Sequence, residues 1–181
     1  MDTTCWNTPT TLTWRESATS SHEFSLLAPA GEAARLSRGG WCSQEATVAT
    51  AFGSWIIRAE GFWKSRILVR DGSTGALVAE CSGPMMSSDR IIAWHDGQHY
   101  QWQRSGWWTD GAKLIDPAGR CLMMIHIGGE KATLRDLFKT HGSVEIRFGE
   151  PERMRLALLT VVSWYLLLMQ REEMASVVVI G

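Results

Sequence analysis

A long apolar segment near the end of the chain constrains the fold more than any other feature. Residues 155–170 read RLALLTVVSWYLLLMQ, and apart from Arg155 they carry no charge. A helix of this composition is hydrophobic on every side, so it must be buried in a core or span a membrane. Gly149, Glu150 and Pro151 favour a helix start, because the missing N–H of proline costs nothing at the first helical position. We therefore expect a helix over about residues 151–173.

The preceding residues indicate strands and almost no helix. Short runs of strand-forming residues alternate with turn residues, and no amphipathic helix separates them. One hairpin carries Asp96-Gly97, which favours a two-residue type I′ turn. Such a series predicts an antiparallel meander rather than βαβ units. The expected strands are 11–15, 23–28, 32–38, 45–51, 55–60, 64–70, 76–81, 90–95, 98–103, 113–116, 121–127, 133–138 and 144–148.

The lengths of the strands and of the helix predict how the two fit together. The uncharged part of the helix is about 22 Å long, whereas a bilayer core needs roughly 30 Å. Strands of this length are about 20–26 Å long, so the helix matches the height of a barrel. About twelve strands close into a tube too wide for its own side chains to fill, and a helix about 10–12 Å across suits the bore.

We therefore expect a mainly β fold, an antiparallel barrel of about 12 strands closed around a buried C-terminal helix. Residues 1–10 are expected to be a loose tail, and residues 11–181 a single barrel domain. The segment 174–181 fits either an added strand or a tail. A membrane anchor is the alternative for the helix. The side chains expected in the core of the helix are Leu156, Leu159, Val162, Trp164, Leu166 and Met169.

Composition excludes several classes of function. The formal net charge is −1, which provides no basic field for nucleic acid. The four cysteines, Cys5, Cys42, Cys81 and Cys121, are spread along the chain without a C-x-x-C pair, so neither a zinc site nor a disulfide framework is expected. The first residues lack the pattern of a signal peptide. We expect a cytoplasmic protein with reduced thiols, in contact with a membrane at most at its periphery, and no cofactor.

No catalytic or metal-binding constellation emerges from the spacing of reactive residues. His95 and His99 flank the expected two-residue turn, so their side chains are predicted to face opposite sides of the sheet. Cys121 and His126 lie an odd number of positions apart on one strand and are expected on opposite faces too. The chain is therefore more readily interpreted as a binding protein than as an enzyme, and no metal site is predicted.

The strongest binding candidate is a basic and aromatic group in the middle of the chain. Arg58 and Lys64 flank the connection 59–63, so cations are expected to cluster near one rim of the barrel, with an aromatic tip that suits a layer of lipid headgroups. A solvated strand face is the alternative interpretation. The residues of this group are Arg58, Trp63, Lys64, Arg66 and Arg70. The segment 104–108, RSGWW, is a second candidate.

The chain resembles the tubby C-terminal-like superfamily, which includes LURP-one-related proteins and phospholipid scramblases, and is most similar to its small bacterial members. The strand series from Leu12 to Phe148 carries the resemblance, together with YQWQRSGWW at 100–108 and SWYLLLMQR at 163–171. The resemblance implies a barrel around a C-terminal helix. Tubby-like members bind phosphoinositide headgroups through basic side chains on the barrel surface, and scramblases are proposed to move lipids with calcium. The chain has no acidic calcium loop of the D-x-[DN]-x-[DN]-G kind.

The expected function is that of a non-catalytic barrel that binds anionic lipid headgroups or a protein partner at its surface. One alternative is a scramblase-like protein that uses the C-terminal helix as an anchor. Another is a barrel that binds a small molecule at its mouth, which requires free space beside the helix. The sequence does not indicate an oligomeric state.

Overall fold

A computed structural model of the chain describes residues 1, 6, 10–39, 44–60, 66–83, 89–105, 111–128, 140–147 and 152–178, with side chains as far as 172. These residues form twelve strands and one helix. They are β1 (Thr10–Glu16), β2 (Glu23–Ala28), β3 (Gly31–Arg38), β4 (Glu45–Thr50), β5 (Gly53–Glu60), β6 (Arg66–Asp71), β7 (Leu77–Ser82), β8 (Asp89–Trp94), β9 (His99–Arg104), β10 (Gly111–Ile115), β11 (Cys121–Ile127), β12 (His141–Ile146) and α1 (Arg153–Val178).

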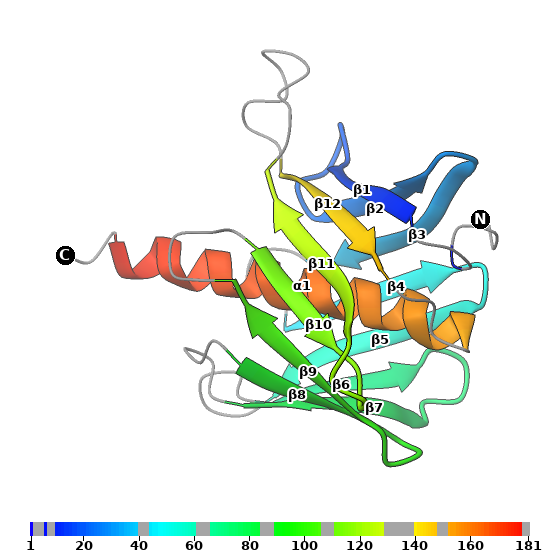
Figure 1. The fold of residues 1–181 in the computed structure, drawn as a ribbon. Helices are drawn as coiled ribbons and strands as arrows, with labels where there is room; N and C mark the ends of the chain where they lie inside the picture. The colour runs from blue at the N-terminus through cyan, green and yellow to red at the C-terminus, as the bar shows by residue number, and fades with distance from the viewer. Residues whose placement is uncertain are drawn as a thin grey trace.

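The strands form one closed antiparallel barrel with the simplest possible order. Each strand pairs with its neighbour in sequence, and β12 pairs with β1 to close the sheet. The helix α1 runs through this barrel, as Figure 1 shows, and its last turns extend beyond the strands. The predicted fold class, a barrel of about 12 strands with a C-terminal helix, is confirmed. The predicted strand 133–138 lies outside the described residues.

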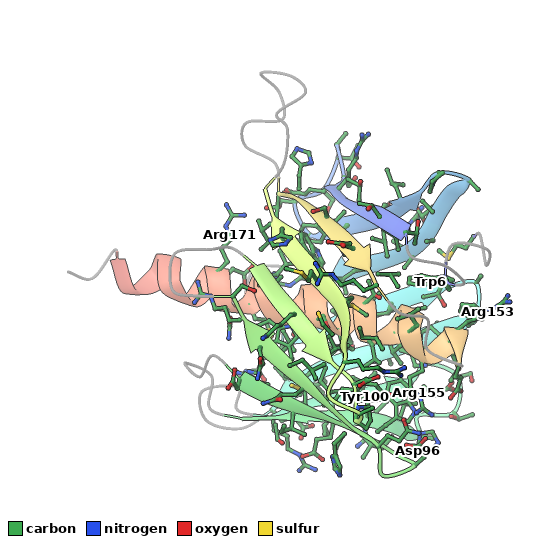
Figure 2. The ribbon with its side chains drawn as sticks, in the orientation of Figure 1. Trp6, Asp96, Tyr100, Arg153, Arg155 and Arg171 are labelled. Carbon is green, nitrogen blue, oxygen red and sulfur yellow. The ribbon has the colours of Figure 1, made fainter. Side chains whose placement is uncertain are left out.

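The barrel has two ends with different connections. At one end, which we call the turn end, the helix begins and short turns join β2 to β3, β4 to β5, β6 to β7, β8 to β9 and β10 to β11. At the other, the exit end, α1 leaves the barrel (Figure 1). Trp6 is 1% exposed and lies near the turn end (Figure 2), so at least this residue of the expected loose tail is packed.

The turn between β8 and β9 differs from the prediction. The N–H of Gly97 donates to the carbonyl of Trp94 at 2.9 Å, and Trp94 N–H donates to the carbonyl of Gln98 at 2.8 Å. The loop therefore has three residues, 95–97, and Gly97 takes a left-handed φ of 86°. The predicted two-residue type I′ turn was wrong, because the hydrogen bond between Trp94 and Gln98 closes the hairpin one residue earlier than that turn requires. His99 consequently pairs with Ala93 rather than with Trp94.

The helix fills the bore. Every side chain from Arg155 to Gln170 is buried, whichever way it points, which explains why the segment has no polar face. The helix ends at Val178, beyond the expected residue 173, so most of 174–181 continues the helix instead of forming a strand. The helix residues expected in the core, Leu156, Leu159, Val162, Trp164, Leu166 and Met169, are each at most 3% exposed.

Trp164 shows how closely the sheet surrounds the helix. Its ring stacks on Trp14 of β1 with centroids 5.3 Å apart and meets Phe24 of β2 edge-on at 6.2 Å. On β12, a Cβ at Gly142 would lie 2.3 Å from a ring carbon of Trp164. Glycine is therefore required there for the strand to pass over the indole ring. Inward-facing aromatic and aliphatic residues of the other strands complete the core.

Candidate binding surfaces

Because the helix fills the bore, a binding site is expected on the outer wall or at the two ends of the barrel. Leu156, Leu159, Val162 and Leu166 are buried in the core cluster, so the space that a small molecule would need beside the helix is occupied by protein in this part of the bore. Among the described residues, no group of three or more His, Cys, Asp or Glu could hold a metal ion. No helix within the described ranges is long and apolar enough to cross a membrane.

The basic group expected at one rim is only partly brought together. Arg58 near the end of β5 and Arg66 at the start of β6 lie on the outer wall at the exit end, where Arg66 pairs with Glu60. Arg70 lies four residues further along β6, about 13 Å away, beside the turn end. There its Nη1 donates to the carbonyl of Gly75 at 3.1 Å. Trp63 and Lys64 fall outside the described residues.

Acidic neighbours balance the two arginines of this rim. Arg66 donates through Nε and Nη2 to the two carboxylate oxygens of Glu80, both at 2.7 Å. Arg58 lies 3.9 Å from Glu60, a looser pair. Both arginine side chains remain more than half exposed, at 61% for Arg58 and 52% for Arg66. Exposed pairs of this kind contribute little stability, so either arginine can exchange its partner for another anion at small cost.

The remaining sequence candidates do not form a site among the described residues. His95 lies in the β8–β9 turn with Nδ1 3.3 Å from the carbonyl of Val78, and His99 is exposed on β9. A bulge near Leu122 shifts the register of β11, so Cys121 and His126 share the outer face, contrary to the expectation of opposite faces. They are five residues apart, roughly 15 Å, and do not meet. In the second candidate segment, 106–108 lies outside the described residues.

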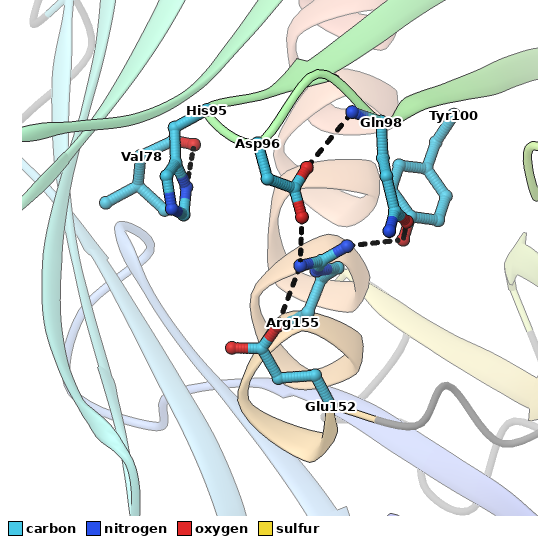
Figure 3. A network of polar contacts seen from close by, with 7 residues as sticks. All are labelled: Val78, His95, Asp96, Gln98, Tyr100, Glu152 and Arg155. Atoms are coloured by element: carbon cyan, nitrogen blue, oxygen red, sulfur yellow. Dashed lines mark hydrogen bonds and ion pairs between the residues drawn. The ribbon is translucent and has the colours of Figure 1, made fainter.

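An ionic network around the buried Arg155 joins the helix to the barrel at the turn end. Figure 3 shows Arg155 between the carboxylates of Asp96 and Glu152, with Nη2 donating to Asp96 at 2.6 Å and to Glu152 at 2.7 Å. Its Nη1 donates to the hydroxyl of Tyr100 at 3.3 Å, and Tyr100 in turn donates to Gln98. The guanidinium also lies 5.0 Å from the ring centre of Trp94. The network fixes the rotation of the helix relative to β8 and β9.

The pKa values of this network follow from its contacts. Burial disfavours the charge of Arg155, but the hydrogen bonds to Tyr100 and Asp96 outweigh it and raise the pKa of the guanidinium. The backbone N–H of Gln98 lowers the pKa of Asp96, and Arg155 lowers it further. Both groups are therefore held in their charged forms, which suits a structural clamp better than a proton-transfer site.

A second clamp lies at the exit end. Arg38 on β3 faces inward and forms a bidentate ion pair with Glu172 of the helix. Its guanidinium also lies 5.8 Å from the ring centre of Tyr165. The hydrogen bond to Glu172 raises the pKa of Arg38. The sequence carried a signal for this contact that we missed, since Arg38 falls on the inward side of an alternating strand together with Leu36.

The outer wall over β1, β2 and β3 carries a shallow groove of about 420 Å³. Arg15 and Arg35 flank Ser25 from the two neighbouring strands. Arg35 is held by Glu32 through two hydrogen bonds of 3.1 Å. Glu16 and Glu23 in the lining give the groove negative as well as positive charge. No sequence motif pointed to it, because its lining comes from separate strands. The groove is lined by Arg15, Glu16, Ser17, Glu23, Ser25, Leu27 and Arg35.

The comparisons with known proteins identify the fold alone. No protein-family model matches the chain, and no curated protein matches its sequence. Among solved structures, the X-ray structure of a protein from Arabidopsis thaliana is similar, with a TM-score of 0.54. The match covers 90% of this chain and 94% of the plant protein, at 12% sequence identity. At this identity the likeness supports a shared architecture over nearly the whole of both chains and says nothing of a shared ligand.

Proposed function

We propose that this chain is a non-catalytic binding barrel of the tubby C-terminal-like superfamily, and that it binds an anionic lipid headgroup at its exit-end rim. The full-length likeness to the plant barrel and the helix in the bore support the superfamily assignment. The helix packs the middle of the bore, which favours the outer wall as the place where a lipid headgroup binds.

The observation that carries the lipid proposal is the position of Arg58 and Arg66. Both side chains are exposed on the outer wall at the same rim, one on each side of the segment 61–65 that holds Trp63 and Lys64. A phosphate monoester group pairs with arginine in the same bidentate geometry as a carboxylate and carries more negative charge. Glu60 and Glu80 can therefore give way to a headgroup. The balanced charge of the rim predicts weak binding that salt suppresses.

Vesicle flotation at low salt tests this proposal. The intact chain should float with phosphatidylcholine vesicles that contain a phosphoinositide, and not with phosphatidylcholine alone. Each arginine near an anionic surface contributes about 1 kcal/mol, so the double variant Arg58→Ala/Arg66→Ala should bind about 30-fold more weakly.

Arg35→Ala is the matched control for this experiment. Arg35 has a similar exposure, 56%, and a similar bidentate glutamate partner, but it lies on β3, away from the rim. Its removal should leave flotation unchanged. Absence of flotation with phosphoinositide vesicles at low salt would refute lipid binding, and an equal loss in Arg35→Ala would show that the attraction is not specific to the rim.

A further inference from the structure

Arg90 is a buried arginine without a carboxylate partner among the described residues. It is the second residue of β8, faces inward like Ile92 and Trp94, and is 2% exposed. Neither its Nε nor its Nη1 has a hydrogen-bond partner in the described part of the chain. An arginine side chain stays charged in proteins, so burial cannot be relieved by loss of a proton.

The two other buried arginines of the bore show what Arg90 lacks. Arg155 is held by two carboxylates at the turn end, and Arg38 by Glu172 at the exit end. Each thus has a counter-charge from the chain itself. A guanidinium removed from water without such a partner is strongly destabilising, whereas a paired one is tolerated. Arg90 therefore needs a counter-charge that the described residues do not supply.

Within the described part of the chain, the residues opposite Arg90 on β9 and beside it on β7 carry no carboxylate. Trp102, its direct partner on β9, also faces inward, and the indole N–H of Trp102 has no acceptor within the described ranges. On β7, the Cys81 sulfur accepts a hydrogen bond from Arg90, but burial raises the pKa of the thiol to about 11, so Cys81 provides no thiolate as a counter-charge at neutral pH. Just beyond β7, a Cβ at Gly83 would lie 3.2 Å from Cγ of Arg90.

We propose that Arg90 and Trp102 form a buried oxyanion-binding site at the exit end, which takes a phosphate or carboxylate group. Directly opposed residues of an antiparallel pair lie about 5 Å apart at Cβ, close enough to donate to one anion. Arg90 is one residue from the end of its strand, so the anion reaches it from the exit end. This site lies inside the barrel and differs from the rim of Arg58 and Arg66 on the outer wall.

Thermal unfolding of the intact chain tests the proposal. The melting temperature is measured in sodium chloride and, at matched pH and ionic strength, in inorganic phosphate, glycerol phosphate and acetate. The wild-type chain should be stabilised by at least one oxyanion in a saturable manner, and about 100-fold in the folding equilibrium at a concentration 100 times Kd. A response to glycerol phosphate that exceeds that to inorganic phosphate indicates a headgroup as the source, and a response to acetate indicates a carboxylate.

Two substitutions separate the site from a general salt effect. Arg90→Met keeps the volume and removes the charge, so it should abolish the response to oxyanions and should be at least as stable as the wild type in chloride. Arg38→Met also removes a buried arginine, but one with its own partner Glu172, and should keep the response. Trp102→Phe, which loses only the indole donor, should weaken binding and remains informative if Arg90→Met does not fold.

Three results would overturn the proposal. The first is a wild-type chain whose melting temperature is the same in chloride and in all three oxyanions. The second is an unchanged response in Arg90→Met or, where that variant does not fold, in Trp102→Phe. The third is a wild-type chain that shows no heat of binding when it is titrated with the stabilising oxyanion.

Discussion

A methyl group added at Gly142 tests the enclosure of the helix most directly. In Gly142→Ala the new Cβ would lie 2.3 and 2.5 Å from two ring carbons of Trp164 and 2.6 Å from the backbone carbonyl oxygen of His126. Carbon atoms in contact prefer separations of about 3.5–4.0 Å, so the ring must move by more than about 1 Å. Trp14 stacks on that ring and Phe24 contacts its edge, which leaves it little room to retreat.

The expected cost follows from this displacement. Extra methyl groups forced into a packed core cost about 1–3 kcal/mol, and a clash that includes backbone belongs at the upper end of that range. We expect Gly142→Ala to lower the free energy of unfolding by about 3 kcal/mol. For a chain of this size the melting temperature should fall by roughly 6–12 °C. Alanine restricts the unfolded chain more than glycine does, which offsets about 0.4–1 kcal/mol of this cost.

Urea unfolding followed by circular dichroism measures the difference. Ser143→Ala, at the next position on β12 and on the outer face, should change the stability by less than about 0.5 kcal/mol. Trp164→Phe combined with Gly142→Ala should cost less than the sum of the two single changes, because the smaller ring leaves space for the methyl group. If Gly142→Ala proves neutral or stabilising, or if the two changes are additive, then Trp164 does not pack under β12.

Three further changes test the core and the two clamps. Val162→Asp should abolish soluble folded protein, because it places an unpaired carboxylate where the native residue is 1% exposed. A variant that is soluble and folded by circular dichroism would contradict the enclosed helix. Asp96→Asn should reduce the loss of unfolding free energy that the wild type shows as the pH falls. The pKa of Asp96 is lower in the native state than in the unfolded chain, where it is about 4. Its stabilising effect is therefore fully present above about pH 4 and is lost as the pH falls through the native pKa. Urea midpoints between pH 2 and 6 measure this, and parallel curves for variant and wild type would argue against the network around Arg155. Arg38→Met should lower the free energy of unfolding by about 1–2 kcal/mol, because Glu172, whose side chain is 31% exposed, loses its partner. An unchanged urea midpoint would show that the ion pair of Arg38 and Glu172 is not formed in solution.

The strands could be predicted because their signals are local. The bounds of β2 and β11 agree with the expected ranges, and the remaining strands differ at their ends by one to three residues. The β8–β9 turn shows the limit of such local signals, because Asp96-Gly97 suits both a two-residue and a three-residue loop. The choice between them depends on the pairing of Ala93 with His99, which the dipeptide does not encode.

The candidate sites were harder to predict, because they depend on which strands become neighbours across the barrel. Arg58 and Arg66 came together because they belong to consecutive strands, whereas Arg70 is carried to the other end by the direction of β6. The contacts of Arg155 with Asp96 and of Arg38 with Glu172 join residues 59 and 134 positions apart. Only the position of the helix inside the barrel brings these pairs together.

The sequence by itself determined that residues 155–170 must be buried and that short antiparallel strands surround them, because hydrophobicity and strand alternation are properties of the chain's local composition. The tertiary structure decided how the helix is oriented in the bore and which charges accompany it inside. Closure of the sheet around the helix buries Arg38 of β3, Arg90 of β8 and Arg155 of α1. Whether a buried charge is paired depends on groups from distant strands, so the absence of a carboxylate for Arg90 among the described residues became visible only in three dimensions.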